Sequence, residues 1–271
     1  MDDIGSTNQH YKNISNLSVA VLLLCVVAYL RIVSVGVDLL EFTFIEDELV
    51  RSLVQIAVEA IMSVGLYAII YVVVYHIYCA VWKKNNKASW VRGEWLHIHV
   101  KRDLRVGTVE IRQNFNTVKA KGHNIRPKGD AAQDLRRETT WHYLQCKVED
   151  VDEGHDFVGC YTADNVAQRH SKDGLHVLQI VGCDSRTGCA NKMVGRFRDT
   201  IPDANTEIGD LADHTGELYF FRMSKKCRAY LYDENGFRYD RLFDLHEREE
   251  FANEPYVLKL RELLSQQNTA V

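Results

Sequence analysis

The chain has 271 residues, and its 33 lysines and arginines against 37 aspartates and glutamates leave a formal net charge of −4. This balance excludes a general nucleic-acid coat, which needs a strongly basic surface. The seven cysteines form no CxxC pair, which argues against a disulfide framework and favours a reducing compartment. The mean hydropathy of −0.24 conceals an uneven distribution, because apolar residues crowd positions 17–82 and most of the charge follows them.

The first apolar run is Leu17–Val37, 21 residues interrupted only by Arg31. A helix needs about 20 residues to cross the hydrocarbon core of a bilayer. The leader before it, residues 1–16, contains Asp2, Asp3 and only one basic residue, so it lacks the basic start of a signal peptide. We therefore expect a short cytoplasmic leader followed by a retained transmembrane helix over about 17–37.

The second apolar run is Leu53–Trp82, and we expect its membrane-spanning part over about 57–80. Aromatic residues recur in it at three- and four-residue steps: Tyr67, Tyr71, Tyr75, Tyr78 and Trp82. They form a stripe along one helix face that ends at a tryptophan suited to the headgroup level. Residues 17–82 thus predict a two-helix transmembrane hairpin.

The charges that flank the spans predict their orientation. Basic residues follow the second span, at Lys83, Lys84, Lys87 and Arg92. The connection Asp38–Ser52 is acidic and contains one basic residue, Arg51. Because positive flanks stay in the cytoplasm, the hairpin tip is expected outside and both termini inside.

Each span carries one charge, Arg31 in the first and Glu59 in the second. A charge inside a span is costly and by default indicates a function. The functional interpretation is a polar seam through which hairpins pair or assemble. The alternative is that both side chains snorkel to the outer interface.

From about Ser89 the periodicity changes from helical to alternating. Trp95, His97 and His99 fall on one face of a predicted strand, and the residues between them fall on the other. A second strand is predicted over Gly107–Phe115. Further strands are predicted at Asn116–Lys121, Thr139–Val148, His155–Thr162, Gly174–Val181, Asn191–Phe197, Gly216–Met223 and Ala229–Tyr232. Eight or nine short strands in succession predict an all-β domain over 89–271, either a sandwich or an up-and-down barrel.

Two segments of this domain have helical character. Asp130–Arg137 is short and polar, and either a helix or a loop suits it. Glu254–Gln267 has an apolar face typical of a helix that packs on the β domain or on a neighbouring subunit.

The sequence offers little sign of catalysis or metal binding. His97 and His99 have a spacing that can hold zinc with a third ligand such as His142 or His176, but structural histidines are the favoured interpretation. The chain has no P-loop, nucleophile elbow, GxGxxG or HExxH motif and no evident carboxylate pair. We therefore expect a protein that is not an enzyme and that has no cofactor.

Arginines and aromatic residues share strand faces in several places. Arg196 and Arg198 lie on one face, Arg222 lies on the same face as Phe220, and Trp141 shares a face with Tyr143. Guanidinium groups bind phosphates and rings stack on bases, so a barrel mouth lined in this way suits a small nucleotide. Ordinary outward-facing sheet residues give the same pattern.

Four short motifs follow the spans: Gly93-Glu-Trp95, Gly107-Thr-Val-x-Ile-x-Gln113, Gly195-Arg-Phe-x-Asp199 and Gly216-Glu-Leu-x-Phe-x-Arg222. With the two apolar runs, this arrangement resembles the SMODS-associating two-transmembrane, β-strand-rich effectors of bacterial cyclic-oligonucleotide antiphage signalling (CBASS). The resemblance implies a lipocalin-like barrel of about eight strands in the cytoplasm. It also implies that the barrel binds a cyclic di- or oligonucleotide made by a partner nucleotidyltransferase, and that no DNA or RNA polymer is bound.

The resemblance further implies that binding drives homo-oligomerisation, disruption of the bacterial inner membrane by the clustered hairpins, and cell death. The residues predicted to bind the ligand are Trp95, Gln113, Trp141, Arg198 and Arg222. Three alternatives remain open: an effector of a type III CRISPR system gated by cyclic oligoadenylate, a membrane-anchored scaffold or lipid-binding barrel without a nucleotide, and a membrane-tethered hydrolase.

Overall fold

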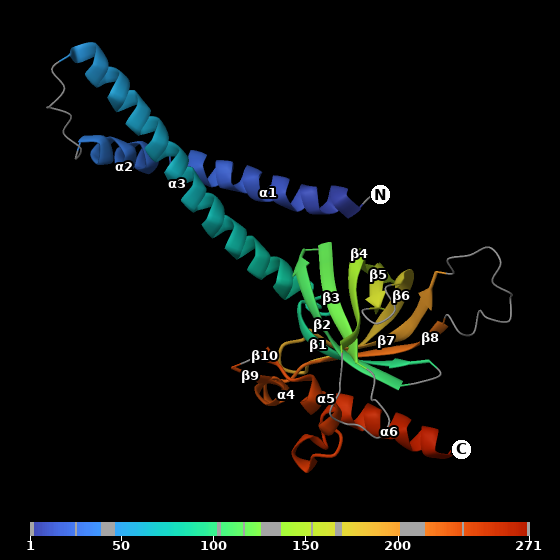
Figure 1. The fold of residues 1–271 in the computed structure, drawn as a ribbon. Coiled ribbons are helices and arrows are strands. Elements are labelled where there is room, and N and C mark those ends of the chain that lie inside the picture. Colours follow the sequence, from blue (N-terminus) through green and yellow to red (C-terminus); the bar gives the residue numbers. More distant parts are fainter. Residues whose placement is uncertain are drawn as a thin grey trace. The chain divides into compact units, whose positions relative to one another are not determined.

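The structure is a computed structural model that describes residues 3–24, 26–38, 47–101, 104–115, 117–125, 137–152, 154–165, 170–200, 215–234 and 236–269. The chain divides into two compact units, Met1–Asn85 and Asn86–Val271 (Figure 1). The division falls between the second apolar run and the first alternating strand of the sequence.

The first unit is helical. Its helices are α1 (Asp3–Leu24), α2 (Val26–Asp38) and α3 (Glu48–Asn85). Within the described residues, α3 is the helix long and apolar enough to cross a membrane, with a mean hydropathy of 2.1 in its apolar window. Cys25, inside the first predicted span, lies outside the described residues, and the two-helix transmembrane hairpin stays a prediction.

The tyrosine stripe of α3 faces α1 rather than standing alone. His10 Nδ1 lies 3.1 Å from the Tyr78 hydroxyl, and the Ser15 and Tyr67 hydroxyls are 3.4 Å apart. Because residue numbers rise along α1 as they fall along α3, the two helices run in opposite directions. The predicted leader is thus the first part of a helix that packs on α3.

The two charges of the apolar runs are not brought together in one chain. Arg31 is exposed and Glu59 is half-buried. Among the described residues no ion pair joins Arg31 to Glu59, and the polar seam stays a prediction.

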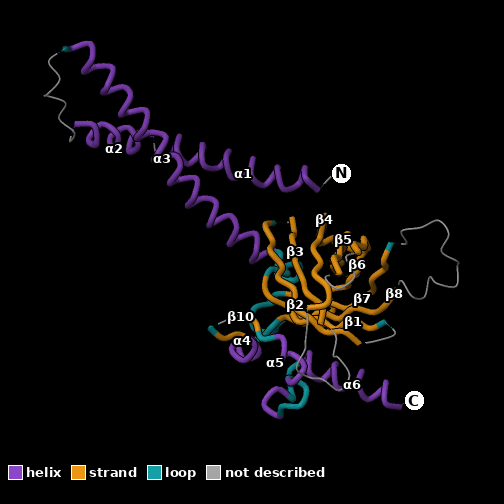
Figure 2. The backbone as a smooth tube through the Cα atoms, in the orientation of Figure 1, coloured by secondary structure: helices purple, strands orange, loops and turns teal. Residues whose placement is uncertain are grey.

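The second unit is built on a closed barrel of eight strands (Figure 2). The strands are β1 (Gly93–Val100), β2 (Leu104–Asn114), β3 (Thr117–Ile125), β4 (Arg137–Val151), β5 (Gly154–Asn165), β6 (His170–Cys183), β7 (Ala190–Asp199) and β8 (Thr215–Arg222). Every strand is antiparallel to the next, and β8 closes the barrel on β1 with Trp95 opposite Arg222. The prediction of an up-and-down barrel is confirmed, and the sandwich is excluded.

The two faces of strand β1 are buried in two different cores, and its alternating side chains belong to one core or the other. Trp95 and His97 point into the barrel, whereas Leu96 and Ile98 belong to a second core outside it. The C-terminal elements cover that outer face (Figure 1). These elements are α4 (Lys225–Leu231), β9 (Tyr232–Asp233), β10 (Gly236–Phe237), α5 (Tyr239–Asp244), the 3-10 turn η3 (Glu249–Phe251) and α6 (Pro255–Thr269). The C-terminal helix predicted at Glu254–Gln267 is confirmed, and it packs on the barrel.

The strand predicted at Ala229–Tyr232 is wrong, because α4 occupies most of this segment. The Ser224 hydroxyl caps α4 by accepting a hydrogen bond from the Cys227 amide at 3.1 Å. Cys227 and Leu231 then lie one helical turn apart and are both buried. The segment predicted as a helix or loop at Asp130–Arg137 falls outside the described residues up to position 136, and Arg137 begins β4.

Inside the barrel, aromatic rings lie across glycines of neighbouring strands. The pairs are His97 with Gly107, Trp141 with Gly122, Tyr143 with Gly159, Tyr161 with Gly174 and Phe197 with Gly216. A Cβ at any of these glycines would collide with the ring that it faces. The absence of side chains at these inward positions thus makes room for large rings, and the middle of the barrel is a packed core.

We predict that Gly122→Ala destabilises the barrel by about 1–3 kcal/mol, because the new methyl group overpacks against the Trp141 indole. Urea unfolding of residues 86–271, which contain both cores of this unit, measures the change through tryptophan fluorescence. The outward-facing Lys121→Ala on the same strand is the control and changes stability by less than about 0.5 kcal/mol. Equal stability of the two variants would show that the glycine is not needed for the ring.

Candidate functional site

A hydrogen-bonded group of rings occupies the middle of the barrel. His97 Nε2 donates to Asn124 Oδ1 at 2.7 Å, and Trp141 Nε1 donates to the same oxygen at 3.0 Å. This assignment leaves His97 Nδ1 as a buried acceptor with no partner among the described residues. The Tyr143 hydroxyl, on the residue two positions after Trp141 in β4, is hydrogen-bonded to His176 Nδ1 at 2.5 Å.

These central histidines are neutral at physiological pH. Burial lowers the pKa of His97 to about 4, although the hydrogen bond with Asn124 opposes the shift. Burial also lowers the pKa of His176 to about 3, with a smaller contribution from His97. A neutral imidazole suits the packed interior, because a protonated one would need a counter-ion there.

One end of the barrel is more polar; we call Lys101, Arg105, His99, Tyr161 and Asp199 the polar end. Strands β1, β5 and β7 end here, and β2 begins here. The Asp199 carboxylate accepts a hydrogen bond from the Tyr161 hydroxyl at 2.5 Å and lies 3.4 Å from Lys101 Nζ. Arg105 stands opposite His99 in the β1–β2 register.

Rings accompany the cations of the polar end. The His99 ring lies 3.9 Å, between centroids, from the Phe197 ring. Burial, followed by the nearby charge of Arg105, lowers the pKa of His99, so this imidazole is neutral as well. Two cations, one engaged carboxylate and several rings form a surface that suits an anionic ligand with an aromatic part.

At the opposite end, Gln113 holds the segment Ser89–Arg92, which precedes β1 and which we call the entry segment. Gln113 Oε1 accepts a hydrogen bond from the Val91 amide at 2.8 Å. Its Nε2 donates to the Ser89 carbonyl at 3.1 Å and to the Phe115 carbonyl at 2.9 Å. All three contacts are with backbone groups.

Arg222 holds the same segment from β8. Its guanidinium donates to the carbonyls of Ala190 at 2.6 Å, Arg92 at 2.6 Å and Trp90 at 2.8 Å. It also lies over the Trp95 ring, 4.7 Å from the centroid. With Gln113, it joins the entry segment to three strands of the barrel.

The five residues predicted to bind a ligand do not form one site. Trp95, Gln113 and Arg222 come together at the entry end, where Trp95 Nε1 donates to the Val91 carbonyl at 2.8 Å and the Arg222 guanidinium lies over the Trp95 ring. Trp141 is buried in the middle of the barrel. Arg198 is exposed on the outer face of β7, as is its predicted companion Arg196. The predicted grouping thus separates into interior, entry end and outer face.

The polar end was missed because the second strand was predicted to begin at Gly107, whereas β2 begins at Leu104. If the predicted strand had begun two residues before Gly107, its alternation would have placed Arg105 on the same inward face as Gln113. His97 and His99 share the inner face as predicted, and His142 is exposed outside. Among the described residues no group of three metal-ligating side chains occurs.

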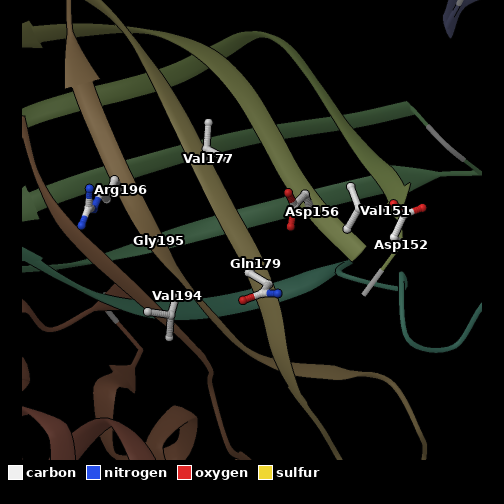
Figure 3. Close-up of a pocket in the computed structure, with 8 residues that line it drawn as sticks. All are labelled: Val151, Asp152, Asp156, Val177, Gln179, Val194, Gly195 and Arg196. Atoms are coloured by element: carbon white, nitrogen blue, oxygen red, sulfur yellow. The ribbon is translucent and has the colours of Figure 1, made fainter. Parts of the chain in front are cut away.

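The outer face of the barrel carries a groove of about 680 Å³, which we call the outer groove (Figure 3). It is lined by Val151, Asp152, Asp156, Val177, Gln179, Val194, Gly195 and Arg196. Figure 3 shows Arg196 on one side of it and Asp156 with the β4–β5 turn on the other. Opposite charges thus flank an aliphatic floor.

No protein-family model matches the chain, and no curated protein matches it in sequence. The resemblance to the CBASS effectors stays a prediction, and the functional argument depends on the residues themselves.

We predict that the barrel loses stability as the pH falls from 6.5 towards 4. In this range the unfolded state binds protons that His97 and His176 cannot accept in the folded state. Each histidine therefore lowers the free energy of unfolding by up to about 1.4 kcal/mol for every unit by which the pH falls. Urea midpoints of residues 86–271 measured across this range test the slope. His97→Gln makes it shallower, and His142→Gln, at an exposed position, leaves it unchanged. A slope equal in both variants would contradict the assignment.

Proposed function

We propose that this protein is a membrane-anchored sensor whose barrel binds a cyclic di- or oligonucleotide at the polar end and whose N-terminal helices act on the membrane. The observation that carries the proposal is the placement of Lys101 and Arg105 with His99 at one end of a barrel that follows a 38-residue apolar helix in the chain. Phosphates bind the cations and bases stack on the rings.

The packing of the barrel limits where the ligand binds. The rings of His97, Trp141 and Phe220 lie within about 6.3 Å of one another between centroids and fill the middle. A nucleotide therefore binds at the end of the barrel, beyond this ring layer and beside Lys101, Arg105 and His99. Arg105 is the cation to test for the phosphate contact, because it stands opposite His99 on the inner face at this end of the barrel.

The response occurs in the membrane. The ligand binds the assembled state more tightly than the monomer and shifts the population towards it. Assembly then concentrates the helices of residues 17–82 in the bacterial inner membrane, where they disrupt the bilayer as the end of an antiphage response. Both termini and the barrel are cytoplasmic, in accord with the basic residues that follow the second apolar run.

A second candidate function is a membrane-anchored scaffold that has no nucleotide ligand. The packed interior favours it, because lipocalin-like barrels that hold a ligand in the middle need a cavity there. The two candidates differ in the role of Arg105, which is structural in a scaffold and binds phosphate in a sensor.

We predict that Arg105→Gln weakens nucleotide binding by at least about tenfold, because a charge-assisted contact to phosphate is lost. The full chain in detergent micelles is screened with cyclic dinucleotides and cyclic oligoadenylates by thermal shift, and affinities are then measured by calorimetry. A ligand at 100 times its dissociation constant adds about 2.7 kcal/mol to the stability of the wild type.

The control is Arg112→Gln, which removes the same charge from the outer face of the same strand, where Arg112 is 77% exposed. It leaves the affinity unchanged. Binding of cyclic oligoadenylates alone would favour the CRISPR context. No shift with any nucleotide, or equal losses in both variants, would favour the scaffold.

A further inference from the structure

On the outer face of β5, β6 and β7, no helix of the described part of residues 86–271 covers the sheet. The opposite side of the barrel is covered by α4, α5 and α6, which bury the outward side chains of β1 and β8. Strand β6, by contrast, presents three aliphatic side chains to solvent: Leu175 is 38% exposed, Val177 40% and Val181 48%. Gln179 lies between Val177 and Val181 on this face, so Leu175 and Val177 form its aliphatic part.

Charges are arranged diagonally across this face. Arg196 on β7 stands beside Val177, and Asp156 on β5 stands beside Gln179, two residues further along β6. The basic side thus lies towards the polar end and the acidic side towards the entry end. Within the described residues, neither Arg196 nor Asp156 takes part in an ion pair or a side-chain hydrogen bond.

We infer that this face binds the same face of a second copy of the chain, with Arg196 of each copy against Asp156 of the other. A twofold axis in the plane of the interface, perpendicular to the line from Arg196 to Asp156, exchanges these two positions. One such axis forms both ion pairs at once, which makes the face self-complementary as an isologous dimer requires.

The same axis also brings the next charges together. Arg198 lies beside Leu175, two residues beyond Arg196 towards the polar end, and Glu149 lies beside Asp156 on β4. Exchange by the axis places Arg198 near Glu149 of the second copy, which also pairs with Lys147 of its own chain. The axis places Val177 near its own equivalent. With strands about 4.8 Å apart and about 3.3 Å per residue, the two sheets cross at about 70°, close to the orthogonal class of sheet packing.

A second copy fits this face better than an unrelated partner does. A partner of one charge would leave either Arg196 or Asp156 unmatched and desolvated. A lipid surface would repel the acidic side of the outer groove. Copies that share a membrane are also confined at a high effective concentration, so a modest interface is sufficient.

The inference rests on the proposed function in one respect, because it names the surface through which copies of the proposed sensor assemble. The test of the inference contains no nucleotide. Dimerisation of the full chain in detergent micelles is measured by sedimentation over a range of protein concentrations. Arg196→Glu and Asp156→Arg each raise the dissociation constant by at least about tenfold, because like charges then face each other twice in the dimer.

The double variant, Arg196→Glu with Asp156→Arg, restores the dissociation constant to within about threefold of the wild type, because the pair is re-formed with its charges exchanged. Arg112→Glu, which makes the same charge change on β2, has no effect. As a second measurement, Val177→Cys in a Cys160→Ser, Cys183→Ser background cross-links to its own equivalent in a second copy.

Rescue by the double variant together with the Val177→Cys cross-link establishes the surface. A monomeric wild type, a double variant no better than the single ones, or an equal effect of Arg112→Glu overturns the inference. If no nucleotide binds in the thermal-shift screen while the dimerisation results hold, the proposed function is contradicted and the dimer is still supported.

Discussion

The barrel depends on the capture of the entry segment by Gln113 and Arg222. This segment has no strand partner of its own, so its buried amides and carbonyls need other hydrogen-bond partners. Gln113 supplies an acceptor for Val91 and a donor for Ser89, and Arg222 supplies donors for Trp90 and Arg92. Three residues separate the carboxyl end of α3 from this segment in the chain.

The middle of the barrel is packed with rings that lie across glycines, and it separates two ends whose polar side chains make different contacts. Because the middle is packed, the interior cannot exchange ligands from end to end, and the histidines there stay neutral. At the entry end, the polar side chains of Gln113 and Arg222 form hydrogen bonds with backbone groups. The polar end, in contrast, keeps Lys101 and Arg105 beside rings, and for this reason it is where a ligand is proposed to bind.

Much of the second unit could be predicted from alternation, because Trp95 and His97 face one core and Leu96 and Ile98 face another. The strand predicted at Ala229–Tyr232 failed because a capping serine and helical spacing of Cys227 and Leu231 outweighed the local preference for a strand. The ligand-binding residues were chosen by type, and residue type does not show whether an arginine meets a ligand or a carbonyl. Arg222 and Arg198 illustrate this, since the first binds backbone and the second faces solvent. The two-helix transmembrane hairpin and the antiphage context stay predictions.

The central claim is that Gln113 and Arg222 join the entry segment to the barrel. Hydrogen–deuterium exchange of the Val91 amide in the wild type and in Arg222→Lys, which keeps the charge but loses the three-way contact, tests it most directly. The account predicts a protected amide in the wild type and exchange at least about tenfold faster in the variant, with the middle of the barrel unchanged. An unprotected Val91 amide in the wild type, or equal exchange in both proteins, would contradict it.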